Sequence, residues 1–246
     1  MEKIPQVKNG FTNKYGVFYP NVKEIMFKKT ELYNNLGTFV AETNREADSF
    51  FVPDDFDLRG VYIYQQLDNP NKAYRIYKEF AEYKFNGYDD DKLIHNLQNK
   101  KQNIKLTEFP YGVVTIEGMI IGQEIPYYPN YETLYKYISK ETDKRKIISI
   151  YKKIIMILKE LYDNKVIYTD IHAKNFMIKN DDVKLIDFEN SQICFEKEEY
   201  YITNMFDNLI SMMNLLNSYI GIDYNIRNNY HFDDILDKVD TLKRTL

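Results

Sequence analysis

The feature that most restricts the fold is a change in the spacing of hydrophobic residues after Pro126. Before it, short β-branched and aromatic segments at 61–64 and 73–77 flank a turn sequence, which predicts an antiparallel hairpin. Segments 112–116 and 119–122, joined by Glu117-Gly118, predict a second hairpin. After Pro126, long stretches of helical periodicity dominate. The chain is therefore expected to be α+β, with a β-rich front half and a helical back half.

The helical half contains one short β-type interruption. Apolar residues recur at helical spacing over 143–164, and Asp143 stands where a helix N-cap is expected. Two short strands are predicted at 176–178 and 183–186, and a last long helix at 199–219. Shorter helices are expected at 131–139 and within 78–100. A small hairpin thus lies between two long helices.

The first 50 residues give weaker signals. Segments 24–27 and 38–41 have the composition of strands, and the sequence at 34–37 is typical of a turn between them. These residues are interpreted as an N-terminal extension, separate or joined to the β-rich part.

Composition excludes several classes of protein. The 246 residues include 44% hydrophobic and 28% charged residues, which is typical of a globular chain. The net charge of −4 does not favour a nucleic-acid partner, and no apolar run approaches the roughly 18 residues of a membrane span. With Cys194 as its single cysteine, the chain cannot form an intrachain disulfide. A cytoplasmic protein is expected, or one delivered into a host cytosol if it is an effector.

Three polar residues around the small hairpin form the candidate site. Asp170 and Asn175 are separated by four residues and precede the hairpin, and Asp187 follows it, 12 residues after Asn175. Carboxylate and amide oxygens are hard ligands of the kind that magnesium prefers. Asp and Asn are also common in turns, so the order, the spacing and the flanking strands carry the argument together.

This arrangement resembles the protein-kinase superfamily, whose catalytic loop reads H-R-D-x-x-x-x-N and whose metal-binding motif reads D-F-G. The resemblance covers roughly residues 55–215. It implies a bilobal protein-kinase-like fold, with the N-lobe at 51–128 and a shortened C-lobe at 129–246. It also implies that Asp170 is the catalytic base, that Lys174 reaches the transferring phosphate, and that Asn175 and Asp187 bind Mg²⁺.

The same resemblance implies nucleotide contacts in the front half. Ala73-Tyr74-Arg75 matches the family's Ala-x-Lys, so Arg75 is expected to contact the phosphates of ATP. Asp91 is the first candidate for its carboxylate partner, with Glu79 or Glu82 as alternatives. Gly60 is the remnant of a glycine-rich phosphate loop, and Glu124 and Ile125 belong to the segment expected to contact adenine.

Several positions depart from the family pattern. The glycine-rich loop and the A-P-E motif are missing, and Glu189 replaces the glycine of D-F-G. His172 and Glu189 match a pattern of aminoglycoside and choline kinases, which act on small molecules. Asp207, on the last long helix, falls where the family has an aspartate that holds the backbone of the catalytic loop.

These observations predict an ATP- and Mg²⁺-dependent phosphotransferase, with a Ser, Thr or Tyr hydroxyl of a protein as the favoured acceptor. A small-molecule kinase is the first alternative, supported by His172 and Glu189. A pseudokinase that binds without turnover is the second, supported by Arg75 and the missing glycines. An activating protein partner is a further expectation for so short a kinase.

Overall fold

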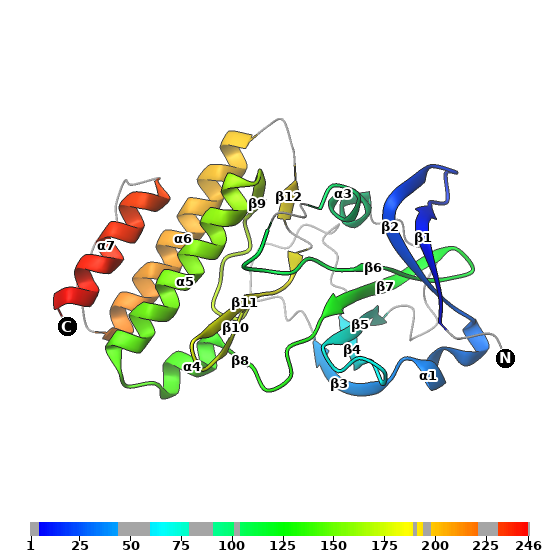
Figure 1. The fold of residues 1–246 in the computed structure, drawn as a ribbon, viewed down its shortest axis with the longest axis horizontal. Helices are drawn as coiled ribbons and strands as arrows, with labels where there is room; N and C mark the ends of the chain where they lie inside the picture. Colours follow the sequence, from blue (N-terminus) through cyan, green and yellow to red (C-terminus); the bar gives the residue numbers. More distant parts are fainter. Residues whose placement is uncertain are drawn as a thin grey trace. The chain divides into compact units, whose positions relative to one another are not determined.

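The structure, a computed structural model, describes most of the chain and confirms the α+β class. The described residues are 5–43, 60–78, 91–100, 104–188, 191–193, 198–220 and 231–245. They divide into two compact units (Figure 1). The first unit comprises Met1–Gln98 and Phe109–Pro129, and the second comprises Asn99–Glu108 and Asn130–Leu246. Each unit is described by itself.

The first unit is built on a seven-stranded mixed sheet in the order β1-β2-β6-β7-β5-β4-β3. Its strands are β1 (Gln6–Thr12), β2 (Phe18–Phe27), β3 (Thr38–Thr43), β4 (Val61–Gln65), β5 (Lys72–Tyr77), β6 (Gly112–Ile116) and β7 (Met119–Pro126). β2 and β6 run parallel, and the other neighbouring pairs are antiparallel. Both predicted hairpins, β4–β5 and β6–β7, are confirmed.

The connection between β2 and β3 differs from the predicted turn. The two strands exist, but they lie apart in the sheet, and the chain between them forms η1 (Lys29–Glu31) and α1 (Leu32–Asn35). Leu32 and Leu36 are buried, so this segment packs across the sheet. Gly37 then turns the chain with a φ of +105°, where a Cβ would meet the carbonyl oxygen of Gln65.

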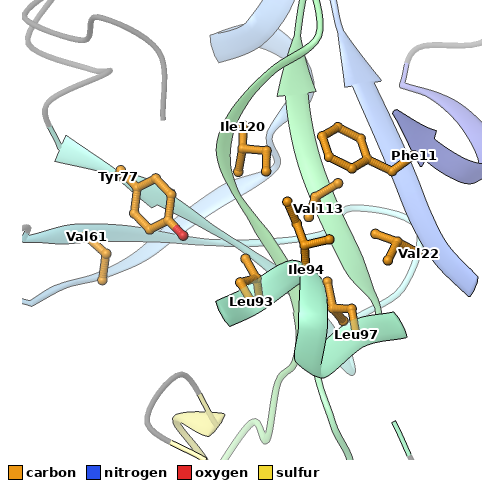
Figure 2. Packing of buried hydrophobic residues seen from close by; sticks show 9 residues of the cluster. All are labelled: Phe11, Val22, Val61, Tyr77, Leu93, Ile94, Leu97, Val113 and Ile120. Carbon is orange, nitrogen blue, oxygen red and sulfur yellow. The ribbon is translucent and has the colours of Figure 1, made fainter. Parts of the chain in front are cut away.

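Strand alternation separates the apolar residues of the sheet onto two faces. One face carries Val113, Ile120 and Tyr77, which pack against Leu93, Ile94 and Leu97 of α3 (Asp91–Gln98) (Figure 2). The other carries Val114, Ile121 and Ile76 and packs against the segment of α1. Central strands buried on both faces are expected to be almost continuously apolar, as β6 is. The remainder of the helix predicted at 78–100 lies outside the described residues.

The second unit is mainly helical. Its helices are α4 (Leu134–Lys140), α5 (Lys144–Asp163), α6 (Glu198–Ile220) and α7 (Phe232–Thr245). The first three confirm the predicted helices. α7 was not predicted; it packs against α5, and Lys152 and Asp240 form an ion pair of 2.7 Å between them. No helix in the described ranges combines the length and the apolar character needed to cross a membrane.

Short strands position the loops of the candidate site. β10 (Phe176–Lys179) and β11 (Asp182–Leu185) form the predicted hairpin, with β8 (Glu132–Thr133) beside β10. β9 (Val166–Tyr168) pairs with β12 (Ser191–Ile193). The chain therefore passes from β9 through Asp170 and Asn175 into β10, and from β11 through Asp187 toward β12.

The N-cap of α5 gives a test of this unit's stability. The Asp143 carboxylate accepts a hydrogen bond of 2.9 Å from the Arg145 backbone N–H. Asp143→Ala should lower the free energy of unfolding by about 0.5–2 kcal/mol, because that N–H loses its partner. The change is measured by urea unfolding, monitored through the helical circular dichroism signal.

Asp163→Ala is the matched control, because it removes an aspartate from the other end of α5. Among the described residues, Asp163 pairs only with Lys159, at a partly exposed position, and such pairs contribute about 0.2–0.5 kcal/mol. Equal effects of the two substitutions would contradict the assignment of Asp143 as the cap.

Candidate functional site

Backbone hydrogen bonds bring the two loops of the site together. The Asn175 N–H donates to the His172 carbonyl at 3.0 Å, which closes a tight turn in the first loop. The Ile186 N–H donates to the Asn175 carbonyl at 2.9 Å, which joins the end of β11 to the start of β10. Asp187 therefore follows directly after a residue bonded to Asn175.

The Asn175 side chain is the centre of the site. It is 5% exposed, and its Nδ2 lies within hydrogen-bonding distance of three oxygens. These are the Tyr168 hydroxyl at 2.9 Å, the Asp170 carbonyl at 3.0 Å and Asp170 Oδ2 at 3.1 Å. All three contacts use the nitrogen. Within the described part of the chain, Oδ1 is therefore the atom of this amide available to a cation.

Tyr168 connects Asn175 to the segment that carries Asp187. Its side chain is fully buried, and its hydroxyl donates to the Ile186 carbonyl at 3.0 Å while accepting from Asn175. Its ring packs edge-on against the Phe188 ring, with the two ring centroids 5.6 Å apart. Burial, followed by the charges of Asp170 and Asp187, raises the pKa of Tyr168 well above its usual value. The hydroxyl thus keeps its proton and remains a donor.

Asp187 has an unusual backbone conformation. Its φ of 63° is left-handed, a region that residues other than glycine seldom occupy. Its side chain is half-buried, and Oδ1 is enclosed by protein. Such conformations cost about 1–3 kcal/mol and concentrate at functional sites. Glu117, Asn130, Lys165 and Asn180 share this conformation, so it counts for Asp187 only together with its position next to a residue bonded to Asn175.

The donor set suits a magnesium ion that also binds a phosphate. Mg²⁺ typically uses one or two protein carboxylates, and waters and substrate oxygens fill its remaining positions. The Asp187 carboxylate and Asn175 Oδ1 are oxygen donors of this kind. In the ranges that the structure describes, no group of three or more His, Cys, Asp or Glu residues could form a protein-only metal site.

Asp170 and Lys174 lie on the accessible side of the first loop. The Asp170 side chain is 31% exposed, although Asn175 holds its Oδ2. Lys174 is exposed, and its backbone N–H donates to His172 Nδ1 at 3.2 Å. The structure thus brings Asp170 and Asn175 into contact and leaves the Lys174 side chain at the surface.

The predicted role of Asp207 is wrong by one residue. Asp207 is exposed, whereas the neighbouring Asn208 donates to the Thr169 carbonyl at 2.7 Å and so holds the loop before Asp170. Helical periodicity contained the missed signal. Asn208 falls on the side of α6 that includes the buried Met205 and Met212, and Asp207 does not.

In the first unit, Glu124 is buried and bonds to neighbouring residues. It is 3% exposed and accepts from Lys23 at 2.6 Å and from Gln66 at 2.9 Å. Its carbonyl accepts from the Tyr111 N–H at 2.8 Å. Ile125 lies in β7, opposite Ala73 of β5. Contact of Glu124 and Ile125 with adenine therefore stays a prediction.

Arg75 and Asp91 do not form the predicted pair. Arg75 lies on β5 on the same face as Tyr77, is half-buried, and has one buried guanidinium nitrogen. Asp91 is exposed in the first turn of α3, and no ion pair among the described residues joins it to Arg75. The two side chains therefore do not pair in this structure, and the expected nucleotide contact of Asp91 stays a prediction.

Of the remaining predicted residues, only Gly60 lies in the part of the chain that the structure describes. Gly60 is buried just before β4, and its carbonyl accepts from the Lys78 N–H at 3.0 Å. Glu79, Glu82 and Glu189 lie outside the described residues.

Comparison with known proteins adds no identification. No protein-family model matches the chain, and no curated protein matches it.

Tyr168→Phe tests the central contacts of this site. The substitution keeps the ring beside Phe188 but removes the hydroxyl that serves Asn175 Nδ2 and the Ile186 carbonyl. The free energy of unfolding should fall by about 1–3 kcal/mol, because a buried group loses its hydrogen-bond partner. Chemical denaturation of the two proteins measures the difference.

Tyr162→Phe is the control, since Tyr162 contributes ring contacts with Phe206 and Phe232. Its hydroxyl makes no hydrogen bond in the described part of the chain, so a change within about 0.5 kcal/mol is expected. A Tyr168→Phe protein as stable as the control would contradict the role given to the hydroxyl.

Proposed function

We propose that the protein is a phosphotransferase that moves the terminal phosphate of ATP, bound with Mg²⁺, to a hydroxyl group. One observation supports this most: Asn175 Nδ2 contacts Asp170, while the Asn175 carbonyl bonds to the residue before Asp187. The partly exposed Asp170 carboxylate thus contacts the side-chain amide of Asn175, and Asp187 follows a residue bonded to the Asn175 backbone. Phosphoryl transfer depends mainly on such positioning and on charge neutralisation.

Asp170 acts on the acceptor in this proposal. Its partly exposed carboxylate orients the acceptor hydroxyl and takes its proton as the oxygen attacks the terminal phosphorus. A new oxygen–phosphorus bond forms, the bond from that phosphorus to the bridging oxygen breaks, and ADP leaves with the electron pair. The proton on Asp170 then passes to solvent.

Asn175 and Asp187 would hold the cation. Bound Mg²⁺ supplies positive charge next to the phosphate oxygens. The protein's contribution is to fix two oxygen donors on adjacent loops, through the Asn175 contacts and the left-handed backbone of Asp187. Lys174, exposed in the same loop, would approach the transferring phosphate from solvent.

A protein hydroxyl is the proposed acceptor, because Asp170 and Lys174 are accessible in the second unit. A small-molecule acceptor is the second candidate, because His172 and Glu189 match the pattern of aminoglycoside and choline kinases. Radiolabelled ATP with a cell extract separates the two, since a labelled protein is detected on a gel and a labelled small molecule by thin-layer chromatography.

Asp187→Ala tests the cation site. The substitution removes the charged ligand, so Mg²⁺-dependent ATP binding measured by calorimetry should be lost, and Asn175→Ala should weaken it less. Asp181→Ala, an exposed aspartate in the β10–β11 turn, is the control and should bind normally. Normal binding of ATP and Mg²⁺ by Asp187→Ala would rule out this site.

Asp170→Ala tests the base. Transfer should fall by about 10²–10⁴-fold, which is the usual contribution of a general base, while ATP binding remains. Transfer of label and calorimetry on the same preparation measure the two quantities. Turnover equal to that of the original protein would remove Asp170 from the mechanism. ATP binding without any turnover in the original protein would instead favour the pseudokinase alternative.

A further inference from the structure

His172 is held in place by two hydrogen bonds within its own loop. Its carbonyl accepts from the Asn175 N–H at 3.0 Å, and its ring Nδ1 accepts from the Lys174 N–H at 3.2 Å. The first bond fixes the backbone turn, and the second fixes the orientation of the ring. The imidazole therefore has one defined direction although its side chain is 46% exposed.

The same bonds determine which ring nitrogen carries the proton. Nδ1 accepts a hydrogen bond, so it has no proton, and a neutral imidazole then carries its proton on Nε2. Nε2 lies 3.3 Å from Asp170 Oδ1. The Nε2–H group thus lies close to the carboxylate whose other oxygen contacts Asn175.

We propose that His172 is a positioning residue that orients the Asp170 carboxylate through its Nε2–H; this rests on the proposed function. Asp170 has a neighbour at each carboxylate oxygen: Oδ2 is hydrogen-bonded to Asn175, and Oδ1 lies at ion-pair distance, 3.3 Å, from His172. The second contact is not aligned as a hydrogen bond in this structure, and catalytic contacts of this kind often tighten when substrate binds. With both oxygens restrained, the carboxylate keeps one direction toward the acceptor hydroxyl.

A purely local role does not explain the choice of histidine. A side chain that only accepts from the N–H two residues later is commonly Asn, Asp or Ser. These side chains would close the turn and could not reach Asp170 as the imidazole does. The second nitrogen of His172, 3.3 Å from Asp170, is what histidine adds.

Two substitutions separate these roles. His172→Asn keeps an acceptor at the position of Nδ1 and loses the group that reaches Asp170. His172→Gln places an N–H₂ group near the position of Nε2. We expect His172→Asn to lower kcat by about 10- to 100-fold with little change in the KM for ATP, since a misplaced group can cost about 10²-fold. His172→Gln should retain more activity than His172→Asn. The thermal unfolding midpoints of the two variants are compared to check that both proteins fold.

A wild-type kcat in His172→Asn, or a His172→Gln protein no more active than His172→Asn, would overturn the proposal.

A spectroscopic measurement tests the proposal without turnover. The protein has three histidines, so ¹⁵N–¹H spectra of the imidazoles can be assigned by comparison with His172→Asn. The His172 ring should carry its proton on Nε2, and that resonance should move in Asp170→Ala. A proton on Nδ1, or an unmoved resonance, would refute the contact even if the protein proved to transfer no phosphate.

Discussion

The geometry of the site depends most on the Asn175 side-chain amide. Its nitrogen serves the Tyr168 hydroxyl, the Asp170 carbonyl and the Asp170 carboxylate, and it does so while 5% exposed. A buried amide left without partners costs about 1–3 kcal/mol, so alternative positions of the loop are disfavoured. The loop between β9 and β10 is thus fixed by the hydrogen-bonding demand of one side chain.

Tyr168 extends this constraint to the second loop. The phenol joins Asn175 to the Ile186 carbonyl, and the Asn175 carbonyl bonds to the Ile186 N–H, so two bonds hold the residue before Asp187. The residue after Asp187, Phe188, is held by packing of its ring against the Tyr168 ring. Asp187 lies between two anchored neighbours, which explains how the structure maintains its left-handed backbone. A satisfied buried network of this kind is rigid.

Local patterns in the sequence predicted the elements whose partners are near in the chain. Both hairpins of the first unit and α5 follow from periodicity and turn residues, and the order of Asp170, Asn175 and Asp187 indicated the candidate site. The parallel pairing of β2 with β6 could not be predicted in this way, because it joins Lys23 to Gly112. The role expected of Asp207 was wrong by one residue because spacing was compared with a family pattern, whereas the buried face of the helix determines which side chains point inward.

The loop contains buried residues that hold its conformation and exposed residues to which the proposed mechanism assigns the chemistry and the positioning of its base. Tyr168 and Asn175 are buried, so substitutions there should change stability and activity together. Asp170, His172 and Lys174 are partly or fully exposed and contribute little to the core, so substitutions there should act mainly on chemistry. Asn175 belongs to both groups in the proposed mechanism, because its nitrogen closes the loop and its oxygen is the proposed cation ligand. A single amide thereby couples folding of the loop to placement of the charged groups, and the site can form before any ligand binds.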